Sequence, residues 1–495
     1  MIGLTRLTRL TRLIRLIRLA CLTRHANRQE GIMARSLASF PLLTAAAVLL
    51  AAAGCDSDEC SGADCDTKAP AGLVFEVVDA APAAAPAGTL VAAPLQLRAS
   101  LDGVGLQAAD LEVTVERGGG EASVAVVPGA EEGLIALSWT LGAAPVLQRL
   151  RVALAADPSV AALVWQTVAT PDPALQPSPF GDVDGWLAAA NIKGSTEDLA
   201  FGVVAGSADI RLVIGVPGGL AAMATDGSIA HVPLTGDPID HPLGVAFDSA
   251  GVLWVADSEG LAVRRVAVDG TVTTPFTTDG KQAFVGPNFV ATMPGDRILV
   301  SDPCLGELIR FNTATSTTDA IHAFDLPTEG GPNGFAFDAT GERLFVVTEN
   351  TALLCNQTKT VKLDAPLASL YVIDFAKGGF GVHTPVEGAT QMGLFGDGMA
   401  FDGEGNLFFV IDTQKDFALD ESQIWVLPAE GGPPAKVLAV KDQLIANVAF
   451  GHGGFGPTLL YASLLSVEPF TPPESRGVVS VDLGLTGQAL IPPMP

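Results

Sequence analysis

Oxygen-bearing side chains recur at one position of a phrase that repeats through the C-terminal part of the chain. Each of them precedes a short apolar stretch that is typical of a β-strand. Carboxylate and amide oxygens, without thiol or imidazole, are the ligands that a hard cation such as calcium prefers. The sequence therefore indicates a site for Ca²⁺ or another divalent cation. The residues at this position are Glu197, Leu243, Asn288, Asn333, Asp397 and Asn447, and all but Leu243 carry a side-chain oxygen.

The phrase that carries these residues repeats with the period of a propeller. It consists of a Gly or Pro turn, an apolar strand, a second turn and a second apolar strand. Successive copies begin at Pro242, Pro287 and Pro332, 45 residues apart, and later copies are longer. Four strands with their turns fit this length. Because one such sheet cannot cover its own apolar faces, the sequence predicts an all-β fold with a six-bladed β-propeller over residues 194–490.

In a propeller the innermost strand of every blade lines one central channel. Residues just before that strand must then converge at one mouth of the channel, although they lie far apart in sequence. We expect Glu197, Asn288, Asn333 and Asp397 to bind the cation there. Three further residues are expected at the same rim, where the two histidines could shuttle protons or simply belong to loops. They are Asn447, His241 and His452.

The same phrases also have an interpretation without chemistry. Pro-Asn-Gly and Gly-Asp-Gly are ordinary turn sequences, and propellers without catalytic activity use them purely as turns. Asp248, Asp338 and Asp402 recur at another single position and are predicted to cap turns. Residues 451–456 match GxGxxG, but strands follow them, so we expect a hairpin there. A non-catalytic propeller that binds a protein or glycan is therefore the alternative function.

Residues 196–487 resemble the senescence marker protein and gluconolactonase family, also called regucalcin-like. The resemblance is carried by the phrases Gly-Pro-Asn-Gly at 331–334, Gly-Asp-Gly-Met-Ala at 396–400, Asn-Val-Ala-Phe-Gly at 447–451 and the strand at 477–484. It implies that Glu197, Asn288, Asn333 and Asp397 hold a central divalent cation. It also implies that the cation polarises a lactone carbonyl or phosphoryl oxygen, while Asp397 acts as base or nucleophile.

The chain departs from that family at two positions. Glu197 is followed by Asp198 and Leu199, where relatives usually have Glu-Gly-Pro. Gly286 stands two residues before Asn288, where the sugar-lactone members carry Arg. A less polar lactone or another ester is therefore the substrate class left open, and the expected activity is that of a calcium-dependent hydrolase.

A separate β domain is predicted before the propeller. Residues 72–170 alternate apolar and polar side chains in short runs, which favours a β-sandwich. The segment Ser138-Trp139-Thr140-Leu141-Gly142 resembles bacterial immunoglobulin-like domains of the invasin group. We expect an Ig-like spacer without catalytic residues, joined to the propeller by a Pro-rich linker over 171–193.

The N-terminal segments predict export. Residues 1–32 are a low-complexity, Arg-rich extension that need not be translated, and residues 33–54 resemble a signal peptide that ends at a lipid-attachment site at Cys55. Residues 55–71 form an acidic tether. We expect a monomer at the bacterial cell envelope, periplasmic or on the outer membrane, that meets the membrane only through its lipid.

Charge and cysteine content fit an exported protein. The chain has 28 Lys and Arg against 54 Asp and Glu, a net charge of −26, which makes nucleic acid an unsuitable partner. Export permits disulfides. Cys60 with Cys65 and Cys304 with Cys355 are candidate pairs, but the sequence does not fix the connectivity.

Overall fold

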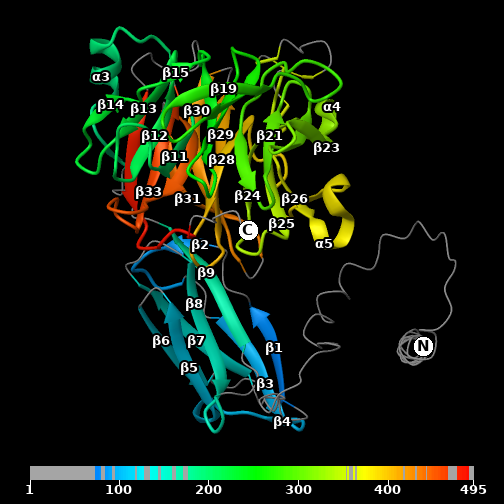
Figure 1. Ribbon diagram of the computed structural model, residues 1–495. Helices are drawn as coiled ribbons and strands as arrows, with labels where there is room; N and C mark the ends of the chain where they lie inside the picture. The colour runs from blue at the N-terminus through cyan, green and yellow to red at the C-terminus, as the bar shows by residue number, and fades with distance from the viewer. Residues whose placement is uncertain are drawn as a thin grey trace, which may run out of the picture. The chain divides into compact units, whose positions relative to one another are not determined.

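The computed structural model is built almost entirely of β-strands (Figure 1). It describes residues 73–79, 84–91, 95–117, 120–126, 134–142, 147–158, 163–170, 177–194, 196–352, 354–355, 361–362, 365–415, 418–429, 432–441, 443–465 and 476–489. Its helices are short: η1 (Ala108–Asp110), α3 (Val183–Ala189), α4 (Leu326–Glu329), α5 (Phe375–Gly378) and η2 (Gly379–Gly381). None of the helices in this described part is long and apolar enough to cross a membrane.

The chain divides into two compact units, Met1–Asp66 and Thr67–Pro495. The first unit lies outside the described residues. The predicted extension at 1–32, the signal peptide at 33–54, the lipid-attachment residue Cys55 and the tether at 55–71 all fall before the first described residue and stay predictions. The pair Cys60 and Cys65 lies there too.

Residues 73–170 form two sheets around one core. The first sheet has the order β1 (Leu73–Asp79), β3 (Leu95–Leu101), β7 (Leu134–Leu141) and β6 (Gly120–Val126), with β4 (Val104–Gly105) beside β3. The second has the order β2 (Ala84–Pro86), β9 (Leu163–Thr170), β8 (Leu147–Leu154) and β5 (Leu111–Arg117). Their alternating apolar side chains, among them Leu97, Trp139 and Val152, are buried in a single cluster, as the period-two pattern predicts.

Six further sheets follow one another along the chain from residue 178 to residue 482. Each has four strands, except the second, which gains a short parallel edge strand. Listed from the innermost strand outward, the first sheet has β11 (Leu199–Gly202), β12 (Arg211–Val216), β13 (Gly219–Met223) and β14 (Ile229–His231), and the second has β16 (Pro242–Phe247), β17 (Leu253–Asp257), β18 (Ala262–Val266), β19 (Thr271–Phe276) and β15 (Thr235–Gly236). The third sheet has β20 (Val290–Met293), β21 (Arg297–Asp302), β22 (Glu307–Asn312) and β23 (Thr317–Ala323), and the fourth has β24 (Gly331–Phe337), β25 (Arg343–Glu349), β26 (Leu370–Asp374) and β27 (Thr384–Pro385). The fifth sheet has β28 (Phe395–Phe401), β29 (Leu407–Lys415), β30 (Ala418–Leu427) and β31 (Ala435–Lys441), and the last has β32 (Leu444–Phe450), β33 (Leu459–Leu465), β34 (Gly477–Asp482) and β10 (Ser178–Pro179).

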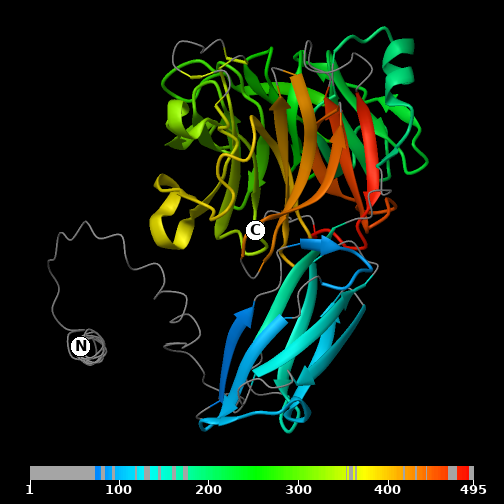
Figure 2. The same cartoon turned by 180° about the vertical axis from the view of Figure 1, so that it is seen from behind.

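Contacts between neighbouring sheets form a closed ring. β11 contacts β16, β16 contacts β20, β24 contacts β21 and β28, and β28 contacts β32, which returns to β11. In both views the red strands from the C-terminal end lie beside the green strands with which the ring begins (Figures 1 and 2). Apolar clusters fill the spaces between neighbouring sheets. This arrangement is propeller-like.

The last sheet is completed by a strand from the predicted linker. β10 pairs with β34, so the last sheet combines residues from before the first sheet with residues from the end of the chain. α3 follows β10, and its Val183 and Leu187 are buried in the cluster that contains Val478. The prediction of a linker over 171–193 therefore missed these elements, because a strand of two residues is too short to show an alternating pattern.

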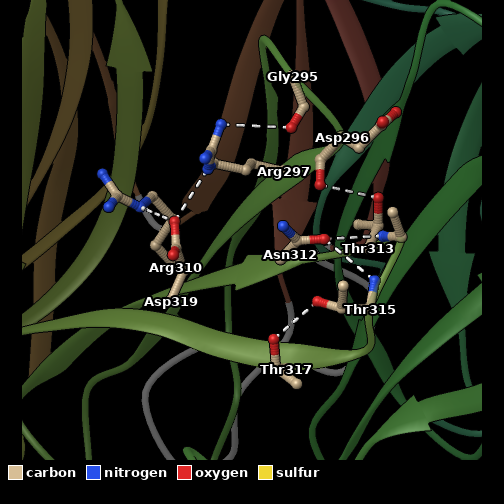
Figure 3. Close-up of polar contacts among 10 residues, drawn as sticks. Gly295, Asp296, Arg297, Arg310, Asn312, Thr313, Thr315, Thr317 and Asp319 are labelled. Atoms are coloured by element: carbon tan, nitrogen blue, oxygen red, sulfur yellow. Dashed lines mark hydrogen bonds and ion pairs between the residues drawn. The ribbon is translucent and has the colours of Figure 1, made fainter.

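Short polar contacts fix the turns and the outer strands of the sheets. As predicted, Asp248 and Asp402 cap turns: each carboxylate accepts two backbone N–H groups of its own turn at 2.8–2.9 Å. Asp338 caps its turn in the same way. Figure 3 shows a comparable contact on the third sheet, where Asp319 accepts from Arg297 and Arg310 on the two adjacent strands at 2.9 and 3.0 Å.

A disulfide joins two segments of the third and fourth sheets. Cys304 and Cys355 are bonded, with 5.3 Å between their Cα atoms, so this candidate pairing is confirmed. Cys304 follows β21 directly, and Cys355 lies beyond the end of β25. The bond therefore ties together the connections that leave two neighbouring second strands.

Candidate metal centre

All four predicted cation ligands line one cavity at the ends where the innermost strands begin. This cavity, which we call the acidic cavity, has a volume of about 260 Å³. Glu197, Asn288, Asn333 and Asp397 come from four different sheets and are each at most 9% exposed. Its other walls include His241, Leu243, Gly286, Cys304, Leu354, Cys355, Phe395, Leu444, Glu349 and Asp412.

Irregularities in strand pairing bring the predicted ligands to this cavity. The register of β24 against β25 shifts between Pro332 and Phe335, and that of β28 against β29 shifts between Gly396 and Met399. Asn333 and Asp397 lie inside these shifts, which re-aim side chains out of the regular alternation. β16 and β32 have comparable shifts at the same position of the repeat. The repeated phrase thus encodes a local distortion as well as a residue type.

Glycines next to these positions let neighbouring innermost strands approach each other closely. A Cβ atom on Gly334 would lie 2.2 Å from the backbone oxygen of Asp397, and one on Gly244 would lie 2.4 Å from that of Asn288. Real Cβ atoms do not come so near, so only glycine fits these positions. The close contact places residues of successive sheets side by side at the cavity.

Asn333 and Asp397 are in direct contact. Asn333 Nδ2 donates a hydrogen bond to Asp397 Oδ1 at 3.3 Å, and both side chains are buried. Asn333 Oδ1 has no hydrogen-bond partner among the described residues. A buried amide oxygen without a partner is costly, and an oxygen of this kind beside a carboxylate fits a hard cation.

The acidity of the cavity is not balanced by basic side chains. Neither lysine nor arginine is present among the described residues that line it. Burial, and then the charges of Glu197, Asp412, Glu349 and Asp198, raise the pKa of Asp397 well above its ordinary value. Burial and neighbouring carboxylates raise the pKa of Glu197 in the same way. A bound divalent cation would relieve this repulsion.

Two acids of the cavity were missed from the sequence. Glu349 and Asp412 belong to second strands, and burial is the main cause that raises the pKa of each to about 8. The signal for them was present, because the second strands of four consecutive sheets run into an acid. Attention to the first strands alone overlooked it. These four acids are Asp257, Asp302, Glu349 and Asp412.

The donor set is mixed. Among the described residues, no three side chains of Asp, Glu, His or Cys converge closely enough to hold one ion by themselves. A cation in the acidic cavity would need amide oxygens such as those of Asn288 and Asn333, with water completing its shell. With these oxygens included, the residues fit a calcium-like ion.

The two histidines expected at one rim lie at opposite ends of the innermost strands. His241 lines the acidic cavity, and its Nε2 is buried without a partner among the described residues. Burial lowers the pKa of His241. His452, by contrast, follows the end of β32 and lines a second cavity of about 490 Å³, which we call the apolar cavity. The error arose because His452 comes after its strand, whereas His241 comes before one.

Asn447 also faces away from the acidic cavity and lines the apolar cavity. Its Nδ2 donates to Asp198 Oδ1, and the other oxygen of Asp198 accepts the backbone N–H of Val245 at 2.6 Å. Asp198 therefore joins three innermost strands, and Asn447 has a structural partner where a rim role was expected.

Comparisons with known proteins give distant structural likenesses. No protein-family model matches the chain, and no curated protein matches it in sequence. A gluconolactonase from Xanthomonas campestris is 15% identical, with a TM-score of 0.42, over 63% of this chain and 96% of its own. A luciferin-regenerating enzyme is 14% identical, with a TM-score of 0.41, over 63% of this chain and 98% of its own. Virginiamycin B lyase from Staphylococcus aureus is 11% identical, with a TM-score of 0.39, over 75% and 99%.

Proposed function

We propose that the chain is an extracytoplasmic hydrolase of lactones or related esters that depends on a divalent cation. In this proposal residues 178–489 are a six-bladed β-propeller, preceded by an Ig-like sandwich. The observation that carries it is the contact between Asn333 and Asp397 in the acidic cavity, where buried oxygens from separate sheets have neither a basic side chain nor a complete set of hydrogen bonds. The activity is inferred from the residues of this chain.

The side chains of the acidic cavity have different roles in this proposal. Glu197, Asn288, Asn333 and Asp397 would hold the cation, which when bound supplies Lewis-acid polarisation of the ester oxygen. The Asn333 amide orients Asp397 through the hydrogen bond to Oδ1. Asp397 would accept a proton from the water that attacks the carbonyl carbon, or would attack that carbon itself before water hydrolyses the acyl-enzyme. In either case His241, whose Nε2 has no partner among the described residues and whose pKa is lowered by burial, would relay the proton of the attacking water to the alkoxide oxygen released when the ester C–O bond breaks.

The walls of the acidic cavity favour a less polar substrate. Leu243, Leu354, Phe395 and Leu444 contribute apolar surface, and Gly286 offers no side chain that could hydrogen-bond a sugar. A polyhydroxylated lactone would leave hydroxyl groups without partners against these walls, which costs binding energy. We therefore propose lactones or esters with an alkyl substituent as substrates.

A panel of alkyl lactones and aryl esters tests the function. Asp397→Asn keeps the shape of the side chain but cannot act as a base, so turnover should fall by about 10²–10⁴-fold, and a chelator should abolish turnover by the wild type. Asp248→Asn, at a turn beside the apolar cavity, is the matched control and should keep its activity. Absence of turnover in a folded protein whose stability does not respond to calcium would instead support a non-catalytic module that binds a protein or glycan.

The location is a separate part of the proposal. The predicted signal peptide and Cys55 imply a protein anchored by lipid at the bacterial cell envelope. Labelled palmitate should be incorporated by cells that express the wild type and not by cells that express Cys55→Ser. Equal labelling of the two would contradict lipid attachment at this residue, without bearing on the hydrolase.

A further inference from the structure

One position of the repeat carries an acid in four consecutive sheets. Asp257, Asp302 and Glu349 are the last residues of β17, β21 and β25, and Asp412 lies at the corresponding part of β29. All four side chains are buried, with at most 3% exposed. Their contacts nevertheless divide them into two different pairs.

The first pair serves the fold. Asp257 accepts the backbone N–H groups of Asp240, His241 and Gly260 and also pairs with Arg264 Nε at 2.9 Å. Asp302 accepts three backbone N–H groups at 2.8–3.1 Å, two of them from the segment that leads into β20, the first strand of its own sheet. Each carboxylate is supplied with donors by its own surroundings. The acids of this pair hold neighbouring loops in place through hydrogen bonds.

The second pair lacks such partners. Glu349 and Asp412 both line the acidic cavity. Glu349 Oε1 and Asp412 Oδ2 have no hydrogen-bond partner among the described residues, although Asp412 Oδ1 accepts from the Ser422 hydroxyl. Two buried carboxylate oxygens that line a cavity without a hydrogen-bond partner are costly in water-excluded surroundings. The arrangement fits a positively charged ligand.

A count of charges separates this pair from the ring ligands. A divalent cation on the ring residues is balanced by the carboxylates of Glu197 and Asp397. Glu349 and Asp412 then remain, with no basic side chain among the described residues that line the cavity, so that only a further cation could stabilise their ionised forms. We propose that the acidic cavity binds a second divalent cation, held by Glu349 and Asp412 with water molecules, next to the cation of the ring. This inference rests on the proposed function, because the ring cation is the first of the two ions; Asp397, Glu349 and Asp412 line the same cavity.

Calcium stoichiometry tests the second site. The mature chain is freed of metal with a chelator and titrated with CaCl₂, and bound calcium is counted by equilibrium dialysis with atomic emission. We expect two ions per wild-type chain and one ion per chain in both Glu349→Gln and Asp412→Asn. One ion per wild-type chain, or two ions in both variants, would overturn the proposal.

Asp302→Asn is the matched control, because it changes an acid at the same position of the repeat that already has backbone donors. It should still bind two ions, while its melting temperature falls. A second measurement uses chelator-treated protein near pH 7, in which Glu349→Gln should raise the melting temperature because it removes a carboxyl group that burial forces into its protonated form, with a pKa raised to about 8. A lower melting temperature would contradict the charge argument.

The two proposals fail in distinguishable ways. If calcium-dependent hydrolysis requires Asp397 but the wild type binds a single ion that Glu349→Gln leaves in place, the second site is wrong and the hydrolase stands. If two ions bind and Glu349→Gln removes one, but no ester is hydrolysed, the second site stands and the hydrolase is wrong.

Discussion

The innermost strands contribute to both the acidic and the apolar cavity and present different residues to each, while second strands and loops add Glu349, Asp412 and Cys304 to the acidic cavity. Asn288 lines the acidic cavity and Phe289, the next residue, lines the apolar one; Asp397 and Met399 are divided in the same way. The ring of strands thus contributes walls to both cavities. The one or two side chains that each strand presents to a cavity decide its share of the chemistry there.

The apolar cavity shows what the ring looks like without a ligand set. Six alanines, one from each innermost strand and none fully buried, line it together with phenylalanines. Methyl groups at these positions carry no charge, and the carboxylate of Asp198, which also lines this cavity, has Asn447 and the backbone N–H of Val245 as hydrogen-bond partners. The alanines are Ala200, Ala246, Ala291, Ala336, Ala400 and Ala449. Residues that recur at one position of the repeat therefore converge in space, whereas the type of residue at that position determines the chemistry of the cavity.

Removal of the disulfide, which lines only the acidic cavity, should produce the largest loss of stability. Cys304 and Cys355 line that cavity and close a loop of 51 residues. Cys304→Ser with Cys355→Ser should lower the free energy of unfolding by about 4 kcal/mol, as measured by urea denaturation. A free energy unchanged from that of the wild type would show that the bond contributes nothing beyond the strands it joins.

Removal of the cation should distinguish the cavities next. At a calcium concentration of about 100 times the dissociation constant, the bound ion stabilises the fold by about 2.7 kcal/mol. Addition of a chelator should therefore lower the melting temperature of the wild type, as followed by calorimetry. Ala336→Ser in the apolar cavity should retain this response, whereas Asn333→Ala should lose most of it. If the chelator lowered the melting temperatures of the two variants equally, the two cavities would not differ in calcium binding.

The two histidines offer a matched pair. His241→Gln should reduce kcat by about 10²-fold with little change in KM, because it removes the proton acceptor that faces the acidic cavity. His452→Gln at the apolar cavity should leave both constants unchanged. Steady-state kinetics on the best lactone measures both variants. Similar losses in the two would mean that the histidines act through the fold.

Enlargement of an alanine should have the smallest effect. Ala336→Leu adds apolar volume to a cavity of about 490 Å³, so it should change stability by no more than about 0.5 kcal/mol and leave hydrolysis intact. Thermal denaturation and kinetics of the purified variant measure this. A marked loss of activity would show that the apolar cavity takes part in catalysis.

The sequence predicted the part of the site that one repeated phrase encodes. Asn333 and Asp397 could be expected to meet because residues at equal positions of a ring converge. Glu349 and Asp412 could not be placed in the same way, since their proximity to Asp397 depends on how second strands approach the cavity. His452 was misplaced because its distance from the nearest strand, and not its side of that strand, was considered.

The interpretation of the fold was limited in a comparable way. Alternating apolar residues revealed the long strands of the sandwich and of the ring. β10 has only two residues and pairs with a strand about 300 residues away in sequence, so no local pattern could predict it.

The pairing of β10 with β34 also has a consequence for how the chain acquires its structure. β10 cannot pair until β34 has been made, so a chain that ends before β34 leaves both β10 and β33 without the partner that completes the last sheet. Such long-range pairing makes folding slow and leaves unpaired edges exposed to other chains. A premature stop near the C-terminus should therefore be as damaging as the loss of an entire sheet.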